Sequence, residues 1–336
     1  MRAILITFAL LLAACGGGGG GAPGQSGAPQ TVANYWPLRG TAAPDGDSIH
    51  KRPLVIKVAN DPAARPQSGM SQADLVLEIP VEGGITRYAL VFQSQDPSKV
   101  GPVRSARQSD LNYLPALHAI LAHVGASESV TQMVRDAAKS GAFIDIDEFQ
   151  HADAFERVAG KVAPYNAYTS GSKIRDAAGD AGRARVDVPA LQFDASVGKA
   201  AGKEATSLAI PYTGAGKVTY AFDAAAGSYH RTQGGQLTMD ADAKKEVMPD
   251  NVVVIKTEVK EIPGTADVTG APSLDFRATG TGTVVILREG KRFDGTWSRG
   301  GTSDMYRFAD SAGAPIPLKQ GLTWIHIVPD DYDLAG

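Results

Sequence analysis

The chain has 336 residues, and its 33 basic and 36 acidic residues give a formal charge of −3 at pH 7. Hydrophobic residues make up 43% of it, enough for a sizeable core, and no basic stripe interleaved with aromatics indicates a nucleic-acid partner. Cys15 is the only cysteine, which excludes an intramolecular disulfide and a cysteine-based zinc site.

The first fifteen residues have the layout of a secretory signal. Arg2 supplies a positive charge, residues 4–12 form an apolar run, and Leu12-Ala-Ala-Cys15 ends it with small residues before the cysteine. The run is too short to span a bilayer, which takes roughly 20 residues. Its last four residues resemble a bacterial lipoprotein box, which implies cleavage before Cys15 and a lipid on its sulfur. We therefore expect an extracytoplasmic protein that is lipid-anchored to a bacterial membrane; an ordinary signal peptide with a chance cysteine is the alternative.

The remaining sequence divides into three parts. Residues 16–50 are rich in Gly, Ala, Pro, Ser and Gln and predict a flexible tether, interrupted by Trp36-Pro-Leu38, which can dock onto a folded body that begins near Arg52. Residues 51–187 mix strand and helix patterns, whereas residues 188–336 show alternation and turns. The predicted fold class is α+β, with a mixed α/β N-terminal domain followed by a mostly β C-terminal domain.

Hydrophobic periodicity predicts the individual elements. One helix follows Ser127 as N-cap and ends at Gly141, and another spans residues 170–178. Strands are predicted in the first domain at residues 53–59, 75–81, 85–92, 119–124 and 143–146. In the second domain they are predicted at residues 218–222, 236–239, 252–259, 283–288 and 323–328. Trp297 is expected in a turn-rich loop.

Gly83-Gly84 lies between two apolar runs and predicts a two-residue hairpin turn. In the resulting register Glu78, Glu82 and Arg87 share one face of the hairpin. Pro80 cannot donate to a ladder, so its strand is expected at a sheet edge or at a bulge. The carboxylate cluster of Glu78 and Glu82 has two interpretations: an ion-pair network that satisfies Arg87, or a pair of catalytic acids.

The segment that follows predicts a second group of charges. Ser105 and Gln108 form a capping-box pattern, so a helix is expected to open at Ser105. Arg104 and Arg107 then lie at its amino end, where cations oppose the helix dipole. Two arginines are explained there if they hold an anion, which can be a ligand's phosphate or carboxylate, or the hairpin carboxylates. The proposed anion- or ligand-binding residues are Arg87, Arg104, Ser105, Arg107 and His123.

His123 ends a predicted strand, where a hydrogen-bonded structural role and a catalytic role are both open. Asp145 and Asp147 alternate with isoleucines, which fits a solvated strand face or a divalent cation, the latter being the weaker interpretation. No metal site, no cofactor and no established catalytic residue are predicted.

Four motifs of the first domain are long and specific. They are Ala64-Arg-Pro-Gln-Ser-Gly69, Val81-Glu-Gly-Gly-Ile-Thr-Arg87, Gly101-Pro-Val-Arg-Ser-Ala-Arg107 and His123-Val-Gly125. Together they resemble the YerB-like family of bacterial envelope lipoproteins, which are built on a domain of unknown function. The resemblance covers about residues 50–330. It implies two α+β subdomains and a membrane-anchored protein outside the cytoplasm. It implies no established catalytic residues.

The sequence therefore favours a lipid-anchored binding or scaffolding protein of the cell envelope. Its partner is expected to be an anionic group of a cell-wall component, a lipid precursor or an envelope protein. The alternative is a hydrolase or transferase that acts on cell-wall glycan, with Glu78 or Glu82 as acid/base and His123 nearby. A third interpretation is a structural spacer that holds the β domain away from the membrane.

Overall fold

A computed structural model describes residues 34–194, 196, 202–214, 216–266 and 270–335. The signal segment with Cys15 and the tether up to residue 33 lie outside the described residues. In the described part of the chain, no helix is long and apolar enough to cross a membrane.

The folded body begins earlier than the predicted start near Arg52. Trp36 and Leu38 are buried, and the carbonyl oxygen of Pro37 accepts a hydrogen bond from the amide of Leu191 at 3.0 Å. The short 3-10 helix η1 (Ser48–His50) follows. Residues 34–50 are therefore part of the fold, and burial of Leu38 in the hydrophobic core helps to attach them to it.

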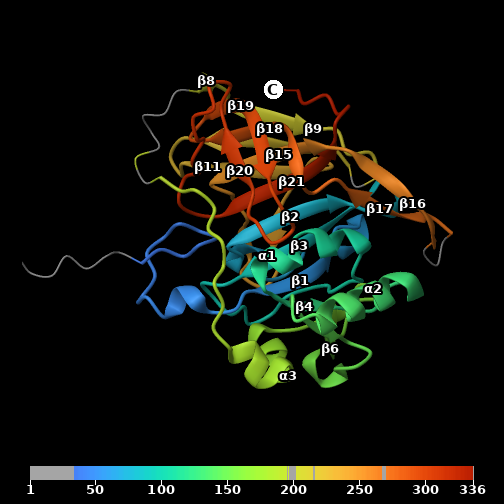
Figure 1. The fold of residues 1–336 in the computed structure, drawn as a ribbon. Helices are drawn as coiled ribbons and strands as arrows, with labels where there is room; N and C mark the ends of the chain where they lie inside the picture. Colours follow the sequence, from blue (N-terminus) through green and yellow to red (C-terminus); the bar gives the residue numbers. More distant parts are fainter. Residues whose placement is uncertain (1–33, 195, 197–201, 215, 267–269, 336) are drawn as a thin grey trace, which may run out of the picture. The chain divides into compact units, whose positions relative to one another are not determined.

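A mixed sheet of eleven strands contains strands from both halves of the chain (Figure 1). The first half contributes β1 (Leu54–Ala59), β2 (Leu75–Pro80), β3 (Thr86–Phe92), β4 (Ile120–His123) and β5 (Ile144–Asp147). The second half contributes β8 (Lys203–Glu204), β15 (Asn251–Thr257), β18 (Gly280–Arg288), β19 (Lys291–Arg299), β20 (Arg307–Ala309) and β21 (Thr323–Pro329). The order is β20-β19-β18-β15-β21-β2-β3-β1-β4-β5, with β8 beside β19.

The last strand, β21, joins the two halves. It pairs in parallel with β2 on one side and with β15 on the other, so Trp324 lies opposite both Val76 and Val252. The predicted boundary between residues 187 and 188 falls in a segment without helix or strand and stays a prediction. The predicted α+β fold class is confirmed, with helices in the first half and mainly strands in the second.

Different elements cover the two faces of the sheet. One face packs against η5 (Gln108–Asn112), α1 (Leu114–Leu117) and α2 (Glu128–Lys139), with Val55, Leu77 and Val91 in its core. The other face packs against α3 (Gly171–Arg183) in the first half. In the second half that face is covered by a small sheet of β9 (Ser207–Ile210), β10 (Val218–Asp223), β11 (Ser228–Gln233) and β12 (Gln236–Leu237). Both faces are therefore covered, and the central strands are continuously apolar.

Short elements complete the described chain. The remaining strands are β6 (Glu156–Arg157), β7 (Ala167–Tyr168), β13 (Met239–Asp240), β14 (Lys245–Glu246), β16 (Val259–Ala266) and β17 (Pro272–Phe276). The remaining 3-10 helices are η2 (Pro62–Ala64), η3 (Met70–Gln72), η4 (Glu82–Gly84) and η6 (Ala152–Ala154).

Both predicted helices are present. Ser127 occupies the N-cap position of α2, and the hydroxyl of Ser170 accepts a hydrogen bond from the amide of Lys173 at the start of α3 (3.3 Å). Helix α3 is longer than predicted and bends at Gly179. The predicted strand at 236–239 is divided between β12 and β13, which belong to different sheets.

The predicted hairpin register is wrong by one residue. Residues 81–85 form the connection, so Glu78 lies opposite Tyr88 and Ile79 lies opposite Arg87. A one-residue slip moves side chains to the other face of a sheet, and Glu78 and Arg87 therefore point to opposite faces. Strand β2 is also central rather than at an edge. Pro80 is tolerated because it is the last residue of β2, two residues beyond the pairing with β21.

Two further predictions are wrong. No helix opens at Ser105, because the segment before it runs extended: Val103 bridges Val58, and the amide of Arg104 donates to the carbonyl of Lys57 at 2.9 Å. The helix that follows, η5, begins after Arg107. Trp297 lies in β19 and is fully buried, and the preceding Gly295 fits there because a Cβ would lie 2.3 Å from the carbonyl oxygen of Ala309 in β20.

Candidate functional site

A pocket lies at the carboxyl ends of three neighbouring parallel strands, β1, β4 and β5. Its volume is about 530 Å³. We call it the arginine pocket; it is lined by Asp61, Glu82, Gly83, Ile85, Arg87, Arg104, Ser105, Arg107, Val124, Gly125, Ala126, Ser127, Phe149 and Ala271. Ligands of open α/β sheets bind outside the carboxyl ends of the strands, so the location itself is typical of a binding site.

Backbone pairing positions the segment that carries two of the arginines. The amide of Val124 donates to the carbonyl of Arg104 at 3.1 Å, and the amide of Ala106 donates to the carbonyl of Gly125 at 3.0 Å. With the bond from Arg104 to β1, these contacts hold residues 103–106 between the ends of β1 and β4. Arg104 and Arg107 are thereby brought to the pocket from an extended segment.

Arg87 lies near the start of β3 and is 2% exposed although it lines the pocket. One terminal nitrogen of its guanidinium donates to the carbonyl of Ser105 at 3.2 Å, whereas its Nε has no acceptor in the described part of the chain. The pKa of Arg87 is lowered to about 9, first by burial and then by the positive charges of Arg107 and Arg104, against the opposing effect of Asp61 and Glu82. The ionised side chain is therefore incompletely compensated.

The other two arginines differ in their partners. Arg107 donates from Nε to Glu82 Oε2 at 2.7 Å. The guanidinium of Arg104 lies 5.7 Å from the ring centroid of Tyr165, and its buried Nε has no acceptor among the residues that the structure describes. Burial lowers the pKa of Arg104 as well. The pocket lining carries three arginines against two carboxylates, Asp61 and Glu82.

The amino end of α2 also reaches the pocket. Ser127, its N-cap residue, lines the pocket but does not cap the helix, and its Oγ lies 3.4 Å from that of Ser129. Gly125 shapes the turn before it: its φ is +60°, and a Cβ would lie 2.5 Å from the ring of Phe149. The helix dipole adds a further preference for negative charge at this side of the pocket.

His123 supports the pocket from behind rather than lining it. It is buried, with Nδ1 2.9 Å from the carbonyl oxygen of Gly125 and Nε2 2.8 Å from Asp145 Oδ1. Burial by itself lowers the pKa of His123, but the hydrogen bond and charge of Asp145 and the charge of Asp147 outweigh it, so the pKa is raised. Asp147 also accepts from the amide of Gly125 at 2.9 Å. Over the described residues, no three His, Cys, Asp or Glu side chains are grouped so that they could hold a metal ion.

Glu78 belongs to a different part of the molecule, the interface between the large and the small sheet. It is 0% exposed and accepts hydrogen bonds from Arg231 Nη2 and Trp324 Nε1, both at 2.9 Å, from Thr86 Oγ1 at 2.8 Å and from Asn60 Nδ2 at 3.2 Å. These charge-assisted bonds more than offset its burial, so the pKa of Glu78 is lowered. The carboxylate is therefore ionised and fully used in joining β2 to β21 and β11.

His326 extends this buried cluster. Its Nε2 lies 2.7 Å from the hydroxyl of Tyr220, and its Nδ1 lies 3.1 Å from the hydroxyl of Tyr212 and 3.4 Å from Glu78 Oε2. The pKa of His326 is lowered to about 4, mainly by burial and further by the charge of Arg231, against the opposing effect of Glu78. The imidazole is therefore neutral at neutral pH.

The low pKa of His326 predicts acid sensitivity. The pKa of His326 is 6.5 in the unfolded chain, so below pH 6.5 the unfolded chain binds a proton there. In the folded protein His326 stays unprotonated down to about pH 4. The free energy of unfolding should therefore fall between pH 6.5 and 4, by about 3 kcal/mol from this residue. Urea unfolding of the wild type and of His326→Gln across this range measures the contribution; parallel pH profiles would contradict it.

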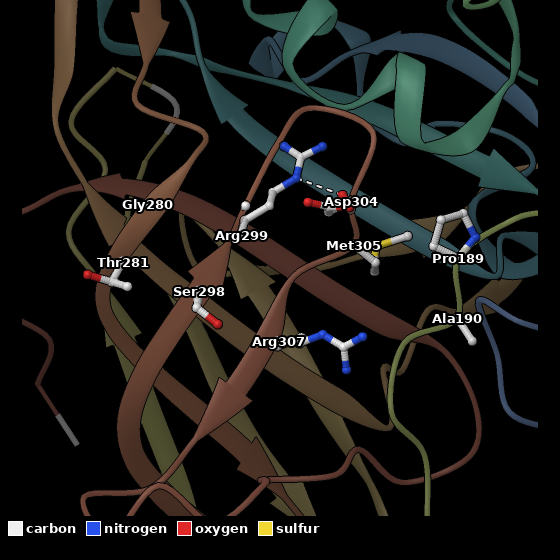
Figure 2. Close-up of a pocket in the computed structure, with 10 residues that line it drawn as sticks. Pro189, Ala190, Gly280, Thr281, Ser298, Arg299, Asp304, Met305 and Arg307 are labelled. Carbon is white, nitrogen blue, oxygen red and sulfur yellow. Dashed lines mark hydrogen bonds between the residues drawn. The ribbon is translucent and has the colours of Figure 1, made fainter.

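A larger pocket, of about 780 Å³, lies beside β19 and β20 (Figure 2). Figure 2 shows the guanidinium of Arg299 turned into the loop before β20, where it donates to the carbonyl of Asp304 at 2.8 Å. It also donates to the carbonyls of Thr302 and Asn112. Arg299 thus already donates its hydrogen bonds to backbone carbonyls, and Arg307 is the exposed arginine that lines this pocket. The arginine pocket is therefore the better candidate for a specific site.

Comparison with known proteins gives a family for both halves. Residues 38–184 match the N-terminal domain, and residues 208–325 the C-terminal domain, of the family described as "Protein of unknown function (DUF3048)". A Bacillus subtilis (strain 168) protein described as "Putative lipoprotein YerB" is 33% identical over 288 residues, which are 83% of this chain and 82% of that relative. The chain belongs to this family.

The DUF3048 assignment confirms the predicted resemblance to the YerB-like family. The crystal structure of the YerB protein from Bacillus subtilis matches this fold with a TM-score of 0.77 at 28% sequence identity. The match covers 90% of this chain and 100% of that chain. Both halves of the fold are therefore shared with that protein.

In this DUF3048 protein the structure brings together Glu82, Arg87, Arg104, Ser105 and Arg107 in one pocket. It separates Glu78 and His123 from them. Sequence reasoning missed Asp61 and Phe149 as site residues. Asp61 lies two residues after the predicted strand 53–59, and Phe149 lies three residues after the predicted strand 143–146, so their position just beyond strand ends was the available signal.

Proposed function

We propose that this protein is a lipid-anchored binding protein of the bacterial cell envelope and that its arginine pocket holds an anionic group. The group belongs to a cell-wall component, a lipid precursor or a partner protein. The proposal concerns binding rather than turnover.

The observation that carries this proposal is Arg87. A guanidinium that is 2% exposed, has an unpartnered Nε and lies among other arginines is an unfavourable arrangement unless an anion offsets its charge. An anion in the pocket would offset the repulsion among Arg87, Arg104 and Arg107. Forked guanidinium groups and a helix amino end are the groups that proteins use to hold phosphate or carboxylate.

The anchoring part of the proposal rests on sequence and on the family. Leu12-Ala-Ala-Cys15 resembles a lipoprotein box and is followed by a glycine-rich segment. The Bacillus subtilis relative is described as a lipoprotein. A lipid at Cys15 would attach the folded body to the outer surface of a membrane through residues 16–33.

A glycan hydrolase or transferase that uses the paired carboxylates has less support. Glu78 is fully buried and saturated with donors, so it cannot approach a substrate. Glu82 does line the pocket, but Arg107 holds one of its oxygens. An acid/base pair needs two carboxyl groups that face one cleft, and Glu78 and Glu82 do not.

Binding of orthophosphate to the full-length protein in detergent tests the anion site. Isothermal titration calorimetry should show binding to the wild type, and Arg104→Gln should weaken it at least about tenfold, since a charge-assisted hydrogen bond contributes about 1.5–3 kcal/mol. The matched control is Arg307→Gln, an exposed arginine of β20 that does not line the arginine pocket.

Unchanged orthophosphate affinity in the Arg104→Gln variant would overturn the anion site. Equal losses in both variants would indicate a general charge effect and would overturn it as well. Folding of each variant is checked by its urea midpoint, which should stay near that of the wild type because both side chains are partly exposed.

A further inference from the structure

We infer that the ligand of the arginine pocket is a saccharide that carries an anionic group. This inference rests on the proposed function and names its ligand class. It uses three features of the pocket besides the arginines: two carboxylates with unused oxygens, the net charge of the lining, and one exposed aromatic ring.

The first feature is a pair of unsatisfied acceptors. Glu82 Oε1 and Asp61 Oδ2 are buried and have no hydrogen-bond donor among the described residues, although both residues line the pocket. A bare anion such as phosphate can pair with the arginines but leaves these two acceptors without a full set of donors. A ligand that presents hydroxyl groups beside its anionic group supplies the missing donors, and carboxylates that accept from neutral hydroxyls form strong hydrogen bonds.

The second feature is the balance of charge. Three arginines against two carboxylates leave one positive charge in the lining, and the amino end of α2 adds to it. A zwitterion such as a dipeptide would place an ammonium group among three guanidinium groups and would leave the excess uncompensated. A ligand with one net negative charge and otherwise neutral donors matches the pocket better.

The third feature is Phe149, which is 78% exposed and lies at the rim against Gly125. The ring offers a flat apolar face beside a polar pocket, and the carbon–hydrogen face of a pyranose fits such a surface while its hydroxyl groups bind elsewhere. The volume of about 530 Å³ leaves room for a sugar together with its anionic group.

Calorimetry of the full-length protein with five probes tests the inference: glucose 6-phosphate, glucuronate, glucose, orthophosphate and alanylalanine. Glucose 6-phosphate or glucuronate should bind at least about tenfold more tightly than orthophosphate, because the hydroxyl contacts add to the charge contact. The tighter of the two shows whether the anionic group is a phosphate or a carboxylate. Glucose, which lacks the charge, should bind more weakly than both.

Two variants separate the hydroxyl and stacking contributions. Asp61→Asn should weaken sugar phosphate binding about tenfold while it strengthens orthophosphate binding, since it removes an acceptor and a negative charge together. Phe149→Ala should weaken sugar phosphate binding roughly threefold and leave orthophosphate unchanged. Leu237→Ala in β12, a half-exposed apolar residue outside the arginine pocket, is the control and should change neither affinity.

Orthophosphate binding without any gain from the sugar would overturn the saccharide and leave the anion site standing. Tighter binding of alanylalanine than of either acidic sugar would also overturn it. If none of the charged probes binds, the proposed function itself fails.

Discussion

Glu78→Gln is expected to lower the free energy of unfolding by about 3–5 kcal/mol, because removing one partner of a buried ion pair leaves the other charge uncompensated. The substitution keeps the shape of the side chain but removes the charge that faces Arg231, whose own exposure is 0%. It also replaces one of the two carboxylate oxygens, each of which accepts two hydrogen bonds, by an amide donor. Urea unfolding at pH 7 measures the loss.

A double-mutant cycle with Arg231→Met sharpens this test. The two residues come from different sheets and lie 153 positions apart in sequence, so the cycle measures a tertiary contact. We expect the double variant to be more stable than the sum of the single losses predicts, since the methionine no longer needs a counter-charge. Glu204→Gln in β8, which is largely exposed, should change stability by less than about 0.5 kcal/mol. A Glu78→Gln variant within about 1 kcal/mol of the wild type would contradict the structural role.

Arg87→Met is expected to have the opposite sign: the empty protein should gain about 1–3 kcal/mol of stability, because an incompletely compensated buried charge is replaced by an apolar side chain of similar length. The pKa of Arg87, lowered to about 9 by burial and by its neighbouring arginines, reports the same strain. Orthophosphate binding should fall at least about tenfold in the same variant. A gain in stability together with a loss of binding would indicate that Arg87 serves ligand binding at a cost in stability.

Arg87→Lys is the matched control for this prediction. Lysine retains the positive charge and therefore should not stabilise the empty protein, but it lacks the planar fork and should bind orthophosphate more weakly than the wild type. If Arg87→Met instead unfolds at lower urea than Arg87→Lys, then the hydrogen bond to Ser105 outweighs the buried charge and Arg87 is structural.

Local sequence patterns predicted much of the secondary structure. Strands β1, β3 and β4 and helix α2 follow the predicted segments closely, and α3 begins where predicted, because periodicity and capping residues act over a few neighbouring positions. The hairpin failed for a physical reason: a five-residue connection replaced the two-residue turn, and the register of a strand depends on its whole buried face rather than on the glycines alone. The same slip separated Glu78 from Arg87.

The sequence predicted most of the charged residues of the site but not the backbone structure that brings them together. The charges of Glu82, Arg87, Arg104 and Arg107 were visible in the sequence, and the structure places all four in one pocket. The expected helix at Ser105 does not form, because the backbone of this segment pairs with β1 and with the end of β4. The helix amino end at the pocket is that of α2, which lies at the pocket only through long-range pairing.

By itself the sequence determined the α+β class, the family, and which charged residues are available, because composition, periodicity and extended motifs are local properties of the chain. Tertiary structure alone decided their partners. It assigned Glu78 to Arg231 and His326 at the interface of two sheets, and it left Arg87 without a full set of acceptors at the carboxyl ends of β1, β4 and β5. The pairing of β21 with β2 and β15 makes this arrangement, and contacts across some 250 residues leave no trace in a local pattern.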